Sequence, residues 1–157
     1  IMRGDVLWFI RLGTFIERAD NTARILDVKY QVIQEDEDSV REFYRWNSLL
    51  RSVGAYESHQ TLYKGLSRQS VAELLILRNE VPRSLRASLE EVEQLLALIE
   101  GNAGHEPRRL TTVLNANLRF GKIEEVFAEG VHQYLTRFLN DIGAIGQSIH
   151  RAYLEAL

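Results

Sequence analysis

The chain of 157 residues contains no cysteine, and this absence removes several classes of function at once. Without cysteine there is no disulfide framework, no thiolate nucleophile and no cysteine-ligated zinc or iron–sulfur site. Proline is nearly as scarce, with only Pro82 and Pro107, and both stand where a helix could begin. Because a chain without disulfides suits a reducing compartment, we expect a cytoplasmic protein.

Long apolar runs and a basic excess are also missing. No apolar run approaches the roughly 20 residues that a membrane-spanning helix needs, and residues 1–5 lack a signal-peptide pattern. The 22 acidic residues outnumber the 19 basic ones, whereas a nucleic-acid-binding surface usually has a basic excess. We therefore expect neither a membrane nor a nucleic acid as partner. A helix that begins directly after the unusual start Ile1–Met2 suggests a fragment of a longer protein.

What the sequence does contain is helical periodicity from end to end. Hydrophobic residues make up 45% and charged residues 26%, close to the averages of globular proteins. Apolar residues recur at spacings of three and four, and no stretch alternates at period two, so strands are not expected. The sequence predicts an all-α protein, a single bundle of five to seven helices over residues 1–157. The expected helices span residues 5–33, 39–53, 56–66, 70–77, 84–100, 107–121 and 123–157.

Local signals refine these helices. The acidic cluster 35–38 ends the first helix and places negative charge ahead of the second, where the helix dipole favours it. Ser70 and Glu73 have the spacing of a capping box and predict a helix start at Ser70. The inward face expected of the second helix consists of Phe43, Trp46, Leu49, Leu50 and Val53.

The first helix carries an unusual row of charges. Positions that advance alternately by four and three form a heptad seam, occupied by Val6, Ile10, Gly13, Glu17, Asp20, Arg24 and Asp27. At about 100° per residue, this seam lies well away from the apolar face that includes Leu12 and Leu26. We call Glu17, Asp20, Arg24 and Asp27 the charged seam. Three interpretations remain open, namely solvated ion pairs, a buried structural network and a ligand site.

Glu129 and His132 form a Glu-x-x-His pattern, the half-site that di-metal carboxylate proteins use in helical bundles. The other three histidines complete no second pattern of this kind, so a two-metal site is not expected. A single-metal site of Glu129, His132 and an acidic residue of the first helix stays a candidate, beside a structural role for the histidine. The sequence has neither a G-x-S-x-G elbow nor a glycine-rich phosphate loop.

Residues 9–30, FIRLGTFIERADNTARILDVKY, resemble the signature of the alpha-E family of bacterial helical proteins. That signature has the form F-[LI]-x-L-G-R-x-[LI]-E-R-A-[DE]-x-T-x-R-[LI]-L-D, and Thr14 stands where the family usually has arginine. Residues 71–77, 82–84 and 123–132 resemble further landmarks, so the resemblance covers nearly the whole chain. Members usually carry two E-R-A-[DE] halves, and this chain, which has one, resembles the C-terminal half.

The resemblance also implies partners. Genes of the family commonly stand beside those of an ATP-grasp ligase and a transglutaminase-like protein, which implies a role in making or processing amide-linked peptides. We therefore expect an accessory module that binds a partner protein or a peptide-like substrate, and that self-associates or pairs with a second repeat. The alternative is an enzyme or ligand-binding domain built on the charged seam, with Arg18 of the matched motif beside it. The catalytic residues and the cofactor stay open.

Overall fold

The computed structural model describes residues 3–33, 38–99 and 105–154, and within these ranges helices joined by short turns and loops make up the chain, with no strand. The all-α prediction is thus confirmed. The described part contains eight α-helices, one more than the upper end of the expected range, and a final π-helical turn. The helices are α1 (Arg3–Val32), α2 (Ser39–Ser52), α3 (Tyr56–Leu62), α4 (Arg68–Ile76), α5 (Leu85–Leu98), α6 (His105–Phe120), α7 (Ile123–Glu129) and α8 (Val131–Ile149), followed by the π-helical turn η2 (His150–Leu154).

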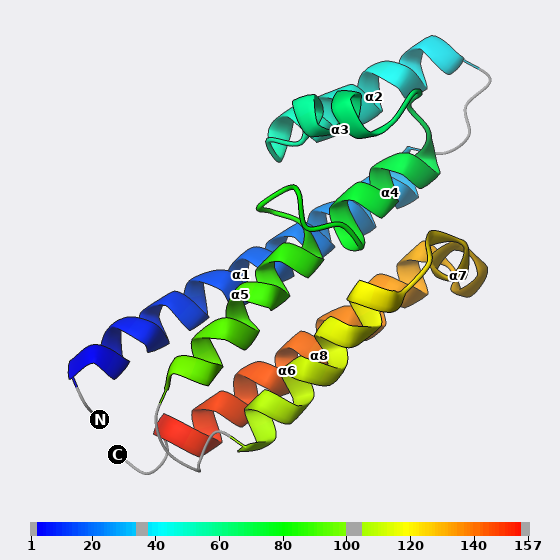
Figure 1. Ribbon diagram of the computed structural model, residues 1–157. Helices are drawn as coiled ribbons and strands as arrows, with labels where there is room; N and C mark the ends of the chain where they lie inside the picture. The colour runs from blue at the N-terminus through cyan, green and yellow to red at the C-terminus, as the bar shows by residue number, and fades with distance from the viewer. Residues whose placement is uncertain (1–2, 34–37, 100–104, 155–157) are drawn as a thin grey trace.

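Four long helices form the body of the molecule. α1 packs against α5 and α8, and α6 closes the ring because it also packs against α5 and α8. Successive members of this ring run in opposite directions, as in an up-down-up-down bundle (Figure 1). The helices α2–α4 are inserted in the chain between α1 and α5 at one end of the bundle, and α7 lies at the same end (Figure 1).

The inner face of α1 follows the predicted periodicity. Leu12 is 1% exposed, and Ala19, Ala23 and Leu26 are fully buried. Ala19 and Ala23 lie one turn apart, and side chains this small allow a neighbouring helix to approach closely. The face then continues into Tyr30 and Ile33, which are also buried. Burial of this apolar stripe is what holds α1 in the bundle.

The prediction of one continuous last helix was wrong, because Gly130 divides it into α7 and α8. Gly130 has a φ of +100°, a region that other residues rarely adopt, and a Cβ atom there would collide with the side chain of Gln133. Gly143 and Gly146, by contrast, lie inside α8 without breaking it. Glu129 and His132 are therefore not on one helix, contrary to the prediction.

Three smaller expectations also need comment. The capping box is formed by Ser67 and Ser70, so α4 begins at Arg68, two residues before the predicted start. Phe43, expected to face inward, is 51% exposed and contacts the ring of Tyr44 instead. Asp38 caps α2 through its carboxylate, which confirms the expected role of an acid at that point, while residues 34–37 of the acidic cluster lie outside the described residues.

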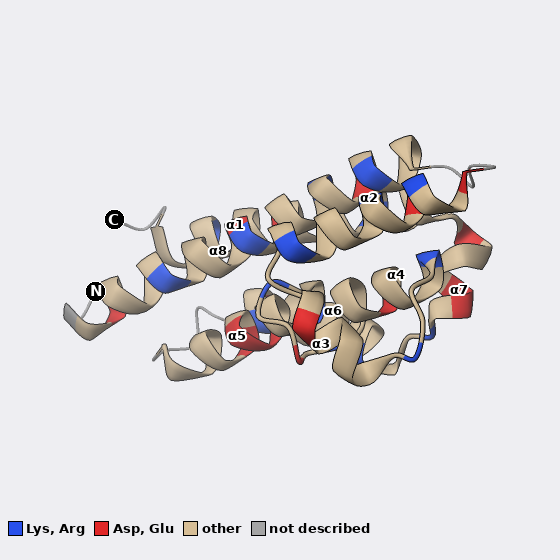
Figure 2. Ribbon diagram, turned by 90° about the horizontal axis from the view of Figure 1, so that it is seen from above, with Lys and Arg blue, Asp and Glu red and all other residues tan. Residues whose placement is uncertain are grey.

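The start of α6 also differs from the prediction. α6 begins at His105, before Pro107, so the end of the polar turn predicted over residues 102–106 is helical. None of the described helices combines the length and the apolar character needed to cross a membrane. Acidic and basic positions are interspersed along the helices (Figure 2).

Candidate functional site

The charged seam of α1 lies at the protein surface. Glu17 is exposed, and Arg24 keeps 65% of its side chain exposed. Asp20 and Asp27 are partly covered, with 32% and 21% of their side chains exposed. Within the described residues, Glu17 and Arg24 therefore do not belong to a buried network. Solvated ion pairs and a ligand site remain.

The middle of the seam borders an open groove of about 420 Å³, which we call the α1 groove. Glu17 and Arg24 line it, while Asp20 does not, although Asp20 accepts a hydrogen bond from Arg24 at 2.8 Å. The motif residue Arg18 also lines it. The complete lining is Thr14, Glu17, Arg18, Asn21, Thr22, Arg24, Ile25, Val53 and Arg83. The groove thus gathers three guanidinium groups and one carboxylate.

Each arginine of the groove is positioned differently. Arg18 lies over the ring of Phe15, with its guanidinium carbon 5.0 Å from the ring centroid. Arg83 comes from the loop before α5 and donates to the backbone carbonyl of Ser52 at 3.4 Å. Among the described residues, neither Arg18 nor Arg83 forms an ion pair, so their charges are available to a ligand. Arg24 forms an ion pair with Asp20, and the hydrogen bond that it donates to this carboxylate raises the pKa of the Arg24 guanidinium.

The chemistry of the α1 groove suits binding of an anion. A guanidinium presents several donors in a planar fork that matches a carboxylate or a phosphate. No histidine lines the groove, and among the described residues no hydroxyl of the lining is hydrogen-bonded to Glu17, the one carboxylate there. The hydroxyl of Thr14 donates to the carbonyl of Ile10 at 3.1 Å. The arrangement can hold a ligand and has no evident catalytic pair.

Asp27, the last residue of the charged seam, does not line the α1 groove. Its Oδ1 lies 2.7 Å from Nδ1 of His132, and Gln31 approaches the same carboxylate oxygen at 3.2 Å. This cluster joins α1 to the beginning of α8 and lines a separate groove of about 350 Å³. The structure therefore divides the predicted ligand residues, with Asp27 apart from Glu17, Arg18 and Arg24.

The two residues proposed for a metal also face different partners. The carboxylate of Glu129 accepts two hydrogen bonds from the guanidinium of Arg137, at 2.7 and 3.0 Å, and this contact lowers the pKa of Glu129. His132 contacts Asp27 instead. Within the described ranges no group of three histidine, aspartate or glutamate side chains is placed to hold a metal ion.

A buried pair, His59 and Ser70, was not found from the sequence. His59 Nε2 lies 2.7 Å from Ser70 Oγ, the ring stacks on Tyr63, and only 4% of His59 is exposed. Burial lowers the pKa of His59. The Ser70 hydroxyl also completes the capping box with Ser67. Because this hydroxyl is engaged by the cap and buried, we assign the pair to stabilising the junction of α3 and α4.

Sequence reasoning also missed Arg83, although a signal for it existed. Residues 82–84 resemble a family landmark, and Arg83 is the part of that landmark that reaches the α1 groove. Nothing in the charged seam predicts that Arg83, in a loop more than fifty positions away, completes the groove.

Comparison with known families gives one match. A model of the Alpha-E family, described as a predicted alpha-helical domain with a conserved ER motif, matches residues 1–154. The chain has a single Glu-Arg pair, Glu17–Arg18, and both residues line the α1 groove. No curated protein and no solved structure gives a significant match.

Proposed function

Because this chain belongs to the Alpha-E family, we propose that it is a cytoplasmic accessory module of a bacterial peptide-ligation system. In this role it binds an acidic group of a peptide-like substrate or of a partner protein in the α1 groove. The observation that carries the proposal is the composition of the groove. Glu17 and Arg18 of the Glu-Arg motif line it together with Arg83, and neither arginine forms an ion pair among the described residues. The partners we propose are an ATP-grasp ligase and a transglutaminase-like protein.

Charge explains why a carboxylate is the expected ligand. Arg18 and Arg83 come from two different elements and face one groove, so a carboxylate between them would accept hydrogen bonds from both. Glu17 at the same site repels a second negative charge, which favours a ligand with one acidic group at this point. Thr14 and Asn21 add neutral polar groups to the rim.

The direct test compares two dye-labelled alanine peptides, one with a free C-terminal carboxylate and one with a C-terminal amide. We expect fluorescence anisotropy to show saturable binding of the carboxylate peptide, and about tenfold weaker binding of the amide. The double variant Arg18→Gln/Arg83→Gln should bind both peptides equally weakly. Arg109→Gln is the matched control, since Arg109 is an exposed arginine outside the groove that pairs with Glu106. Equal affinity of the wild type for both peptides would disprove carboxylate recognition.

The partner proposal needs its own measurement. Purified ATP-grasp ligase from the same gene neighbourhood should bind the wild-type chain in surface plasmon resonance, and the Arg18→Gln/Arg83→Gln variant at least about tenfold more weakly. Absence of binding by both the ligase and the transglutaminase-like protein would count against the accessory role. Product formed by this chain alone from an amide-linked peptide would instead favour the enzyme alternative.

An exposed apolar surface at the N-terminal end of α1 supports our proposal that the chain pairs with another helical unit. Val6, Leu7 and Ile10 are 49%, 56% and 63% exposed and form an apolar strip on the first turns of the helix. Exposed apolar strips of this kind mark interaction surfaces. We propose that the chain is one half of a two-repeat protein and that the strip packs against the other half, which carries the second E-R-A-[DE] repeat. Ile10→Ser should abolish association of the separately expressed halves, and unchanged association would contradict this pairing.

A further inference from the structure

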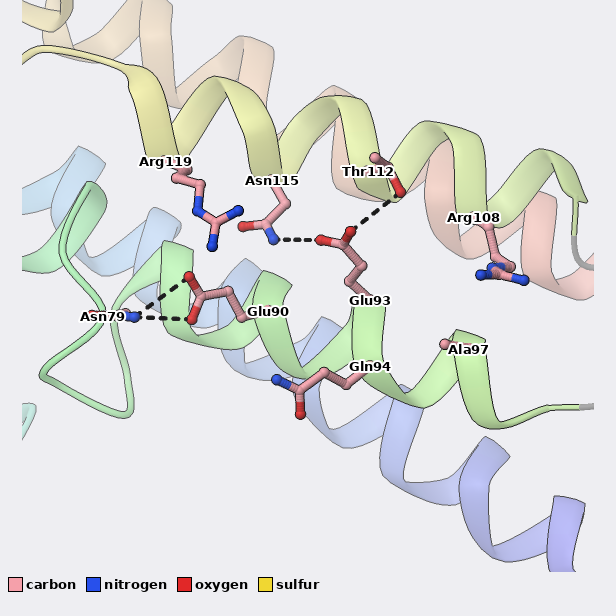
Figure 3. A pocket seen from close by; sticks show the side chains of 9 residues that line it. All are labelled: Asn79, Glu90, Glu93, Gln94, Ala97, Arg108, Thr112, Asn115 and Arg119. Carbon is pink, nitrogen blue, oxygen red and sulfur yellow. Dashed lines mark hydrogen bonds between the residues drawn. The ribbon is translucent and has the colours of Figure 1, made fainter.

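A second groove, of about 410 Å³, lies between α5 and α6 (Figure 3) and shares no lining residue with the α1 groove. We call it the α5–α6 groove. Its volume lies in the range of small-molecule sites. Side chains of α6 at positions 108, 112, 115 and 119 recur at spacings of four, three and four, so they share one face of that helix. None of them was singled out from the sequence.

The order of charges along this groove is the informative feature. Arg108 and Arg119 are separated by about 16 Å along the axis of α6, at 1.5 Å per residue. Glu93 of α5 lies between them, because its carboxylate accepts hydrogen bonds from Thr112 at 3.4 Å and from Asn115. Figure 3 shows the same order, with Arg119 at one end, Glu93 in the middle and Arg108 at the other end. The groove thus presents a positive, a negative and again a positive group.

Within the part of the chain that the structure describes, none of these three groups has an oppositely charged partner in an ion pair. Among the described residues, neither Arg108 nor Arg119 forms an ion pair, and Glu93 receives hydrogen bonds only from neutral groups. Glu90, which also lines the groove, differs in this respect. It is paired with Arg86 at 2.9 Å and also accepts from Asn79 at 3.1 Å. Glu90 is therefore neutralised, and Glu93 is the carboxylate left for a ligand.

Asn115 supplies an independent sign of an unfilled site. The residue is 7% exposed, and its Oδ1 atom is buried without a hydrogen-bond donor. Its amide nitrogen is directed to Glu93, so the carbonyl oxygen is turned towards Arg119 (Figure 3). An acceptor left without a donor costs free energy. A cationic group placed at Glu93 could donate to this oxygen as well.

From this arrangement we propose that the α5–α6 groove binds a free acidic α-amino acid such as glutamate. Its ammonium group donates to Glu93 and to Asn115 Oδ1. Its two carboxylates accept hydrogen bonds from Arg119 and Arg108. The ligand's negative, positive and negative groups complement the charge order of the groove. The site is separate from the α1 groove, and its failure would leave the proposed function untouched.

The experiment is a titration of the whole chain with L-glutamate, followed by amide NMR shifts in α5 and α6. Three comparators each change one feature of the ligand. Glutarate lacks the ammonium group, L-glutamine lacks the side-chain charge, and L-lysine reverses it. We expect saturable shifts with glutamate, and affinities at least about tenfold weaker for all three comparators.

Variants locate the site. Arg119→Gln and Arg108→Gln should each weaken glutamate binding about tenfold, and since both arginines are exposed these changes should leave the fold intact. Glu93→Gln should remove the preference for glutamate over glutarate. Arg109→Gln, a neighbouring arginine outside the groove, is the matched control and should bind as the wild type.

Four outcomes would overturn the proposal. Shifts that do not saturate would mean that no site exists. Equal binding of glutarate would mean a site for anions alone, and stronger binding of lysine would mean a site for cations alone. Retention of full affinity in both Arg119→Gln and Arg108→Gln would place the ligand elsewhere.

Discussion

The inner and outer faces of α1 belong to one helix but differ in composition and in burial. On the inner face Leu12, Ala19, Ala23 and Leu26 are buried and apolar, and Thr22 is the buried polar residue beside them. On the outer face, apolar residues at both ends, such as Ile10 and Val28, remain exposed around a charged middle. The inner face is what folding requires. An exposed face of this composition contributes little to folding, so its pattern is better explained by what the domain binds.

The largest expected change in stability comes from a substitution on the inner face of α1. Leu26→Ala removes a fully buried side chain and should lower the free energy of unfolding by about 2–5 kcal/mol, through lost burial and the cavity left behind. Urea denaturation measures it. The matched control is Val28→Ala, two positions away and 57% exposed, for which we expect a change within about 0.5 kcal/mol. Similar losses for the two variants would refute the contrast between the faces.

The buried side chain of His59 gives a second prediction about stability, through its pKa. Burial holds the pKa of His59 below its usual value of 6.5, so the unfolded chain binds a proton more readily than the native chain. The free energy of unfolding should therefore fall as the pH is lowered through about 6.5. His59→Gln keeps a partner for Ser70 but cannot titrate, and its unfolding curve should depend less on pH in this window. An unchanged pH dependence would show that His59 is not the responsible group.

A gain of binding is expected on the outer face. Thr14 lines the α1 groove where the family usually has arginine, so Thr14→Arg adds a fourth guanidinium to it. Binding of the carboxylate peptide should tighten by about 1 kcal/mol, roughly fivefold. Thr61→Arg is the matched control, because Thr61 is also exposed and donates to the carbonyl four residues earlier. Equal gains in both variants would indicate a nonspecific charge effect.

The smallest effect should come from the contact between Asp27 and His132. His132 is 54% exposed, and partly exposed pairs of this kind contribute little to stability. Asp27→Asn should change the free energy of unfolding by less than about 1 kcal/mol. It should leave binding of the carboxylate peptide unaltered, since Asp27 lies outside the α1 groove. A loss of peptide affinity would restore Asp27 to the ligand site predicted from the sequence.

Periodicity predicted the inner face of α1 but not the break at Gly130. A glycine is compatible with both outcomes, as Gly143 and Gly146 inside α8 show. Only the positive φ at Gly130 separates α7 from α8, and nothing in the neighbouring residues announces it. The start of α4 was misplaced for a similar reason, because Ser67 and Ser70 could each serve as a cap.

The candidate site was predicted only in part. Glu17, Arg18 and Arg24 do share a groove, since they are close together on one helix. Arg83, which completes the groove, and Asp27, which leaves it, depend on how α1 packs against other elements. The α5–α6 groove escaped prediction altogether, although the spacing of Arg108 and Arg119 on α6 was visible.

The sequence by itself determined that the chain is helical, where most helices lie and which face of α1 is buried. These properties depend on hydrogen bonds and apolar spacing within a few turns, so a short window of residues contains them. Only the tertiary structure decided that Arg83 and Arg18 line the same groove, and that Glu93 lies between Arg108 and Arg119. The reason is that a groove combines faces of distant elements, and packing of the whole bundle chooses which faces meet.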